Sequence, residues 1–118
     1  MKSGNLIVDL TFQFSLDIIV YTNLLDEKRK WSMSKQLFRS GTSVGANVKE
    51  AQFGESTNDF IHKLKISEKE AEETGYWLLL CKQSKGYPDP GKLLADVDNI
   101  KRILGKIICT TKKNRSAA

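Results

Sequence analysis

The residues best suited to acid–base or nucleophilic chemistry lie in the middle of the chain. His62 is the one histidine and would serve as general base, with Cys81 or Ser43 as the nucleophile. The carboxylates that could assist it are Glu68, Glu70, Glu72 and Glu73. His62 stands beside Lys63 in a charged stretch, so a solvated surface histidine explains it more simply than a catalytic one. We therefore expect no catalytic residues and no enzymatic activity.

Metal and cofactor sites follow spacing rules that this chain does not meet. Cys81 and Cys109 are isolated, without the CxxC spacing or the His/Cys cluster of a zinc site. A di-metal carboxylate bundle uses inward-pointing Glu-x-x-His pairs, and the sequence contains none. The sequence predicts neither a metal nor a cofactor, and its two isolated cysteines favour a reducing, cytoplasmic location.

The stretch FRSGTSVGANVKEA, residues 38–51, has the glycines and small polar residues of a phosphate-binding loop. A Walker-type loop, however, ends in Gly-Lys-Ser/Thr after a strand, and neither feature is present. Small and apolar positions recur instead at helical spacing, as Leu37, Gly41, Val44, Val48 and Ala51. Glycine inside a helix costs about 1 kcal/mol relative to alanine. Close approach of a neighbouring helix at Gly41 and Gly45 would offset that cost.

A polar stripe follows the same segment, on the side roughly opposite Leu37. It consists of Arg39, Ser43, Asn47 and Glu50, at spacings of 4, 4 and 3. Because the chain elsewhere uses lysines and glutamates on its polar faces, we expect this face to be covered, with Arg39 paired to a carboxylate. An exposed polar face without a special role is the alternative. The candidates for helix packing or an oligomer interface are Arg39, Gly41, Ser43, Gly45, Asn47 and Glu50.

Positive charge is concentrated in the second half of the chain, which holds the whole formal excess of +5. Residues 1–60 carry seven Lys/Arg and seven Asp/Glu, whereas residues 61–118 carry twelve and seven. From residue 101 onward no acid occurs, and the basic residues are Lys101, Arg102, Lys106, Lys112, Lys113 and Arg115. A basic end of this kind attracts phosphate backbones, and these six are the candidate nucleic-acid contacts. A solvated, solubilising tail is the alternative interpretation.

Amphipathic periodicity divides the chain into four helical segments. We expect them at about 6–27, 33–54, 57–84 and 90–112, with a basic tail at 112–118. Capping residues mark three starts: Ser32 or Ser34 for the second helix, Ser56 for the third, and Asp89-Pro90 for the fourth. Nothing resembles a pair of strands. Short connections between four such helices predict one domain, 1–118, folded as an all-α, antiparallel up-down four-helix bundle.

Three of these segments carry the following stripes, at spacings of three and four residues. The first has Leu10, Phe14, Ile18, Tyr21 and Leu25; the third has Phe60, Leu64, Ser67, Ala71, Thr74, Leu78 and Cys81; the fourth has Leu93, Val97, Ile100, Leu104 and Ile107. Beside its stripe the first segment has further apolar residues, Phe12, Leu16, Ile19 and Val20. Such a wide apolar arc calls for more neighbours than one small bundle supplies, which favours a homo-oligomer.

Length and composition are those of a globular protein, with 118 residues, 40% of them hydrophobic and 28% charged. No apolar run approaches the roughly 20 residues that a membrane-spanning helix needs. The start, MKSGNLIVDLTF, lacks the uninterrupted apolar stretch of a secretion signal. We expect a cytoplasmic protein without a membrane segment.

The run SKQLFRSGTSVGANVKEAQFGESTNDFIHKLKISEKEAEETGYWLLL, residues 34–80, resembles the core of the bacterial 23S rRNA intervening-sequence protein family. The resemblance is carried by LFRSGTSVGANVKEA, DFIHKLKISEKEAEET and YWL, and extends over essentially the whole chain. It implies an antiparallel four-helix bundle that assembles into a homo-oligomeric, typically pentameric ring. It also implies kinship with the accessory proteins of diversity-generating retroelements, basic barrels that bind nucleic acid and a reverse transcriptase. It implies no catalytic residues.

Charge asymmetry and this resemblance together predict a non-enzymatic oligomer. Its basic surfaces would bind RNA or DNA through phosphates, with little sequence readout. The alternative is a protein-interaction scaffold whose basic surface serves solubility or an acidic protein partner.

Overall fold

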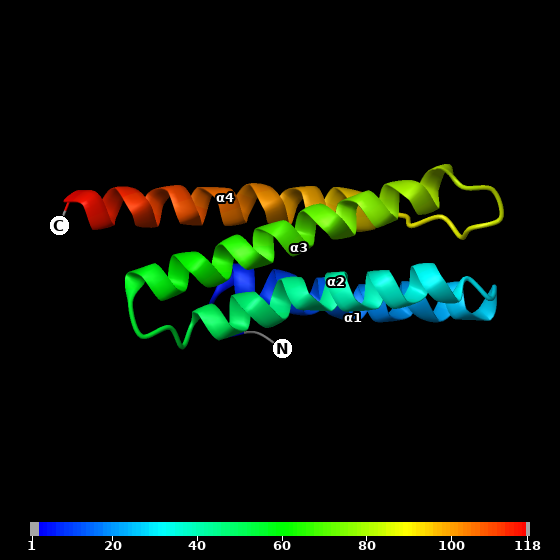
Figure 1. The fold of residues 1–118 in the computed structure, drawn as a ribbon, viewed down its shortest axis with the longest axis horizontal. Coiled ribbons are helices and arrows are strands. Elements are labelled where there is room, and N and C mark those ends of the chain that lie inside the picture. The colour runs from blue at the N-terminus through cyan, green and yellow to red at the C-terminus, as the bar shows by residue number, and fades with distance from the viewer. Residues whose placement is uncertain (1–2, 118) are drawn as a thin grey trace.

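The computed structural model describes residues 3–117, which form four α-helices joined by short loops (Figure 1). The helices are α1 (Leu6–Glu27), α2 (Trp31–Ala51), α3 (Thr57–Gln83) and α4 (Leu93–Ala117). No strand occurs within residues 3–117, so the expected all-helical architecture is confirmed for them. Residues 1, 2 and 118, which belong to the predicted domain and basic tail, lie outside this described part. None of the described helices is long and apolar enough to cross a membrane.

The four helices pack in a ring order, each against two others, as in a bundle. Contacts are extensive between helices that follow one another in the chain, and sparser between α1 and α4. The molecule is elongated, measuring 53 × 25 × 20 Å. The α1–α2 and α3–α4 loops lie at one end of it and the α2–α3 loop lies at the other (Figure 1). The last turns of α4 extend beyond the α2–α3 loop, so the end of this helix projects from the bundle (Figure 1).

The core is built from one stripe of each helix. Its fully buried side chains include Ile18, Leu25, Leu37, Val44, Val48, Leu64, Leu78, Val97 and Leu104. At a few positions the core uses a residue close to the expected one. Ile7 and Thr11 are buried where Leu10 is expected, Ile61 where Phe60 is expected, and Ile108 where Ile107 is expected. A straight α-helix drifts by about 20° per heptad relative to a 3.5-residue repeat, so a strict heptad pattern loses register toward the ends of long helices.

Helices α1 and α3 begin at side-chain caps. Asn5 accepts a hydrogen bond from the backbone N–H of Val8 at 3.4 Å. Ser56 accepts one from the N–H of Asp59 at 3.1 Å, as its position in the sequence indicates. Each cap satisfies an N–H group that the first turn of a helix leaves unpaired. Local chemistry therefore sets both starts.

Helix α2 begins at Trp31, two residues earlier than expected, and without a serine cap. Lys30 precedes it and makes no capping hydrogen bond through its side chain. Ser34 lies inside the first turn, buried, where its hydroxyl donates to the carbonyl of Thr22 on α1 at 3.2 Å. The predicted N-cap at Ser32 or Ser34 is wrong, because the Ser34 hydroxyl bonds to α1 and does not cap its own helix. The helix also ends three residues before the expected position 54.

Helix α4 both begins and ends later than expected. The Asp89 carboxylate accepts a hydrogen bond from the N–H of Gly91 at 2.9 Å, and Gly91 has a φ of 59°. This turn in the left-handed region delays the helix to Leu93, so the expectation that Pro90 opens the first helical turn is wrong. At the other end, the residues expected as a basic tail from 112 onward continue the helix to residue 117. No glycine or proline ends it there, and cations near a helix C-terminus interact favourably with its dipole.

Candidate nucleic-acid interface

Two glycines bring α2 close to α1. A Cβ atom at Gly41 would lie 2.8 Å from Cγ1 of Ile18, and one at Gly45 would lie 3.0 Å from the carbonyl oxygen of Thr11. Such short distances leave no room for a side chain without movement of α1. The small residues of this segment therefore serve the contact between α1 and α2, and they set the position of the polar stripe beside it.

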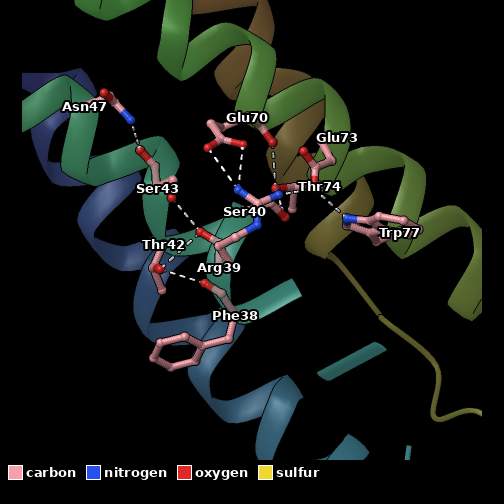
Figure 2. Close-up of polar contacts among 10 residues, drawn as sticks. All are labelled: Phe38, Arg39, Ser40, Thr42, Ser43, Asn47, Glu70, Glu73, Thr74 and Trp77. Atoms are coloured by element: carbon pink, nitrogen blue, oxygen red, sulfur yellow. Dashed lines mark hydrogen bonds and ion pairs between the residues drawn. The ribbon is translucent and has the colours of Figure 1, made fainter. Parts of the chain in front are cut away.

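The polar stripe of α2 runs along α3 and is only partly covered within the chain. Arg39 is exposed and lies between two carboxylates of α3, with Nη1 3.2 Å from Oε2 of Glu70 and Nη2 paired to Glu73 (Figure 2). Glu50, also exposed, accepts a hydrogen bond from Nζ of Lys63 at 2.8 Å. Within the single chain this face is partly covered, with Ser43 and Asn47 half-buried, and its covering by a neighbouring chain stays a prediction. Its charged ends lie at the rim of the α2–α3 contact, where solvent reaches them.

The two middle residues of the stripe bond to their own helix. Ser43 donates to the carbonyl of Arg39 at 2.6 Å, and the Asn47 amide donates to the carbonyl of Ser43 at 2.9 Å (Figure 2). Back-bonding of this kind satisfies short polar side chains without a partner helix. Each of these two side chains thus makes one hydrogen bond within its own helix.

Two buried hydroxyl contacts join α2 to α3 beneath the stripe. Ser67 donates to the carbonyl of Val44 at 2.7 Å, and Oγ1 of Thr74 lies 2.9 Å from Oγ of Ser40 (Figure 2 shows the second pair). In the sequence Ser67 and Thr74 are recognisable only as small residues in the apolar stripe of α3. Because a buried hydroxyl needs a hydrogen-bond partner, the two hydroxyl residues at core positions are the feature of the sequence that could have indicated these contacts.

Glu73 connects Arg39 to Trp77. The indole Nε1 of Trp77 donates to Oε2 of Glu73 at 3.0 Å. This hydrogen bond, together with the Arg39 ion pair, outweighs the effect of burial and lowers the pKa of Glu73. In return Glu73, and then Glu70, raise the pKa of Arg39. The guanidinium is thus neutralised by two carboxylates and is poorly placed to bind an external phosphate.

The side chains considered for catalysis are not brought together. His62 is exposed near the start of α3, and Cys81 is buried nineteen residues later in the same helix, about 28 Å away at 1.5 Å per residue. Burial raises the pKa of the Cys81 thiol, which disfavours the reactive thiolate. Across the described residues, no group of three or more His, Cys, Asp or Glu side chains is placed to hold a metal ion.

The six candidate cations all lie on α4, but they divide between two faces. An outward face, which we call the outer stripe, carries Arg102, Lys106 and Lys113. The face toward α3 carries Lys101, Lys112 and Arg115. Sequence alone groups all six as one basic end, whereas the helical rotation of α4 separates them.

The outer stripe is exposed along its length, and no carboxylate within residues 3–117 forms an ion pair with it. Arg102 donates through Nη2 to the side-chain oxygen of Asn99, a neutral partner one turn earlier. Spacings of four and seven residues keep the three charges on one line. This line presents uncompensated positive charge to solvent.

Lys101 differs from the other five, because it is neutralised in the α3–α4 contact. Its Nζ lies 3.2 Å from Oε2 of Glu72 and 3.4 Å from Oδ1 of Asp98, and its side chain is 27% exposed. Burial disfavours its charge, but the two carboxylates outweigh that effect and raise the pKa of Lys101. An external phosphate would have to displace these partners.

Comparison with known proteins agrees with this fold. A family model described as 23S rRNA-intervening sequence protein matches residues 5–106, which span all of α1 to α3 and the first part of α4. A crystal structure of a protein with unknown function from the S23 ribosomal protein family of Bacteroides thetaiotaomicron is 39% identical, with a TM-score of 0.81 over 86% of this chain and 97% of that one. None of the curated proteins matches the chain significantly. The chain therefore belongs to the 23S rRNA-intervening sequence protein family.

Proposed function

We propose that the protein is a non-enzymatic, cytoplasmic homo-oligomer that binds nucleic acid through its basic surfaces. The observation that carries this proposal is the outer stripe of α4, Arg102, Lys106 and Lys113, whose charges have no carboxylate partner among the described residues. Cations in a line on a helix engage phosphates, which position a nucleic acid but carry no sequence information. We therefore expect RNA or DNA to be bound with little sequence specificity.

The proposed assembly is an antiparallel up-down bundle repeated around an axis as a pentameric ring. It is supported by large apolar side chains left exposed on α1, namely Leu6, Phe12, Leu16, Ile19, Val20 and Leu24. Contiguous exposed apolar surface on a soluble protein marks a contact site. Repetition around a ring would multiply the outer stripe, so many phosphate contacts would act together. The proposal includes kinship with the accessory proteins of diversity-generating retroelements, which rests on sequence resemblance alone.

A protein-interaction scaffold is the second candidate function. It is favoured by exposed apolar side chains away from α1, among them Tyr76 and Leu79 on α3, whose residues are 59% and 48% exposed. In that case the outer stripe would serve solubility or an acidic protein partner. The two functions differ in whether the purified protein retains nucleic acid on its own.

The test is binding of the nuclease-treated protein to labelled RNA and DNA across a salt series, with the oligomeric mass followed by light scattering. The informative variant changes Arg102, Lys106 and Lys113 to Gln. Its control changes Lys28, Lys35 and Lys82 to Gln, three exposed lysines that also lack ion pairs among the described residues. We expect affinity of the wild type to fall steeply with salt, and the outer-stripe variant to lose about tenfold or more in affinity at unchanged mass.

Three results would argue otherwise. An equal loss in both variants would mean that net charge, and not the outer stripe, drives binding. Unchanged binding by the outer-stripe variant would remove these residues from the interface. No binding by the wild type at low salt would leave the scaffold function, and pull-down with acidic protein partners would follow.

A further inference from the structure

A hollow of about 390 Å³ lies open to solvent between α3 and α4, in the half of their contact nearer the loop that joins them. Its apolar lining comes from Gly75 and Leu79 of α3 and from Leu94 of α4. Leu79 is 48% exposed and Leu94 is half-buried, and Gly75 contributes no side chain to fill the space. We call this site the α3–α4 hollow. It presents apolar surface to solvent on the side of α3 away from its buried stripe.

The charged lining of the α3–α4 hollow is acidic on balance. It consists of the carboxylates of Glu72 and Asp98 and the ammonium of Lys101, whose Nζ contacts both acids. The two acidic side chains are 75% and 70% exposed. Their second oxygens, Oε1 of Glu72 and Oδ2 of Asp98, accept no hydrogen bond within residues 3–117. One ammonium thus balances one of two carboxylates, in a chain whose formal charge is +5.

Tyr76 adds an exposed aromatic ring beside these carboxylates. It lies one turn after Glu72 on α3, lines the hollow and is 59% exposed. Its ring packs against the ring of Trp77, with centroids 5.5 Å apart and planes tilted by 58°. The face of a tyrosine ring attracts a cation, and so do the two carboxylates. Ring and carboxylates together therefore favour a positively charged group.

The nearest cations of the two helices do not take this place. Lys69 precedes Glu72 by three residues and forms no ion pair within the described chain, and Arg102 donates to the side-chain oxygen of Asn99. Neither of these cations lines the hollow. The space beside the free carboxylate oxygens is therefore open to a cation from another molecule.

The chemistry of the hollow also restricts which molecule fits it. Exposed carboxylates repel the phosphates of a nucleic acid. The apolar face of α1 in a second copy is unsuited as well, since residues 6–27 carry four Asp/Glu and no Lys or Arg. A partner for the hollow has to bring positive charge and an apolar side chain together, which a segment of a protein can do.

We propose that the α3–α4 hollow docks a basic, apolar segment of a partner protein, in which an arginine or a lysine stands next to a leucine-sized side chain. The cation would bond to the free oxygens of Glu72 and Asp98 and lie on the Tyr76 ring. The apolar side chain would cover Leu79 and Leu94. Arginine suits the site better than lysine, because its planar fork can bond to carboxylates while it stacks on an aromatic ring. This interaction goes beyond nucleic-acid binding and uses none of the outer-stripe residues.

The first experiment measures fluorescence anisotropy of three labelled peptides of equal length with the nuclease-treated full chain. One peptide alternates Arg and Leu, one alternates Arg and Ser, and one alternates Glu and Leu. We expect the Arg/Leu peptide to bind and the other two to bind about tenfold more weakly or less, since each lacks one of the two contacts. Equal binding of all three peptides, or no binding of the Arg/Leu peptide, overturns the inference.

Two double variants with the same change in charge locate the binding site. One carries Glu72→Gln and Asp98→Asn. The control carries Asp26→Asn and Glu27→Gln, at two exposed acids near the end of α1. We expect the first to bind the Arg/Leu peptide about tenfold more weakly, and the control to differ from wild type by less than about twofold. Equal losses in the two variants would show that net charge alone attracts the peptide, and would overturn the inference.

A second pair of variants tests the ring without changing charge. We expect Tyr76→Ala to weaken peptide binding by about threefold to tenfold, and Tyr76→Phe to keep it, because phenylalanine retains the aromatic face. Equal binding by both would remove the ring from the site. Light scattering of the Glu72/Asp98 variant should give the wild-type mass; a smaller mass would make the hollow a contact between copies and overturn the inference.

RNA and DNA binding, measured on the same proteins, separates this inference from the proposed function. We expect the Glu72/Asp98 variant to keep its affinity for nucleic acid, because the outer stripe is intact. Peptide binding by a protein that retains neither RNA nor DNA would support the hollow and overturn the proposed function. Nucleic-acid binding without peptide binding would overturn the hollow alone.

Discussion

Ile18 of α1 occupies the space that a side chain at Gly41 of α2 would need. A Cβ atom at Gly41 would lie 2.8 Å from Cγ1 and 2.9 Å from Cγ2 of Ile18, and both residues are buried. Ile18 is enclosed by the core and cannot turn away without disturbing it. The close approach of α1 and α2 depends on this pair, because a residue without a side chain at position 41 leaves room for Ile18.

We expect Gly41→Ala to lower the free energy of unfolding by about 1–3 kcal/mol, as overpacking does, although alanine is the better helix former. Urea denaturation measures the effect. The control is Gly75→Ala on α3, where a Cβ would have its nearest contact at an ordinary 3.6 Å from Val97. There we expect a gain of about 0.5–1 kcal/mol from helix propensity. Equal behaviour of the two variants would refute the steric account.

Tyr21→Phe tests the connection between α1 and the α3–α4 loop. The hydroxyl of Tyr21 donates to the carbonyl of Pro88 at 2.6 Å, and burial raises the pKa of Tyr21, so the group stays a donor. We expect the loss of this bond to cost about 1 kcal/mol and to speed amide exchange in residues 84–92. Tyr87→Phe is the control, since it keeps the ring that Lys30 covers at 4.8 Å. Similar losses in both variants would contradict an anchoring role for the Tyr21 hydroxyl.

The lowered pKa of Glu73 predicts a pH response of Trp77. Because the folded chain favours the charged carboxylate, its contribution to stability is present above the ordinary Glu pKa of 4.5 and is lost as pH falls through the lowered value. The contribution is small, since the group is partly exposed and solvent screens it. In a Trp31→Phe background, we expect the fluorescence of Trp77 to change with a midpoint below 4.5. Glu73→Gln should abolish that transition; its persistence would assign it to another group.

The apolar face of α1 should be needed for assembly but not for folding. Leu16 and Val20 are 43% and 62% exposed, so changing both to Glu removes little from the core. We expect light scattering to report a smaller mass for this variant, with helicity and thermal midpoint nearly unchanged. Leu79→Glu, at a residue 48% exposed on α3, is the control and should keep the wild-type mass. An unaltered mass in the α1 variant would place the interface elsewhere.

Periodicity in the sequence is enough to predict the helices and most of the core. Bounds of α1 and the start of α3 agree with expectation, because the apolar spacing and the caps Asn5 and Ser56 act within a single helix. Ser34 shows where this reasoning fails. A serine near a helix start is a cap by local rules, yet contact with Thr22 of another helix gives it a different partner. Local patterns do not contain the position of a neighbouring helix.

The candidate site depends more strongly on such tertiary information. Lys101 and Lys112 are equivalent in the sequence, as two lysines in an acid-free stretch. They differ because Glu72 of α3 and Asp98 pair with Lys101, whereas Lys112 forms no ion pair among the described residues. Arg39 likewise pairs with a carboxylate, as expected, at the exposed rim of the α2–α3 contact. Helix rotation and alignment decided these outcomes, and composition does not encode them directly.

The ring order of the helices has a consequence for how the chain reaches this structure. Three of the four helix contacts join neighbours in sequence, and the fourth, between α1 and α4, is the sparsest. A chain dominated by such local contacts closes short loops first, and helical bundles of this kind fold in microseconds to milliseconds. We expect the α1–α2 and α3–α4 hairpins to form early and α4 to dock on α1 last.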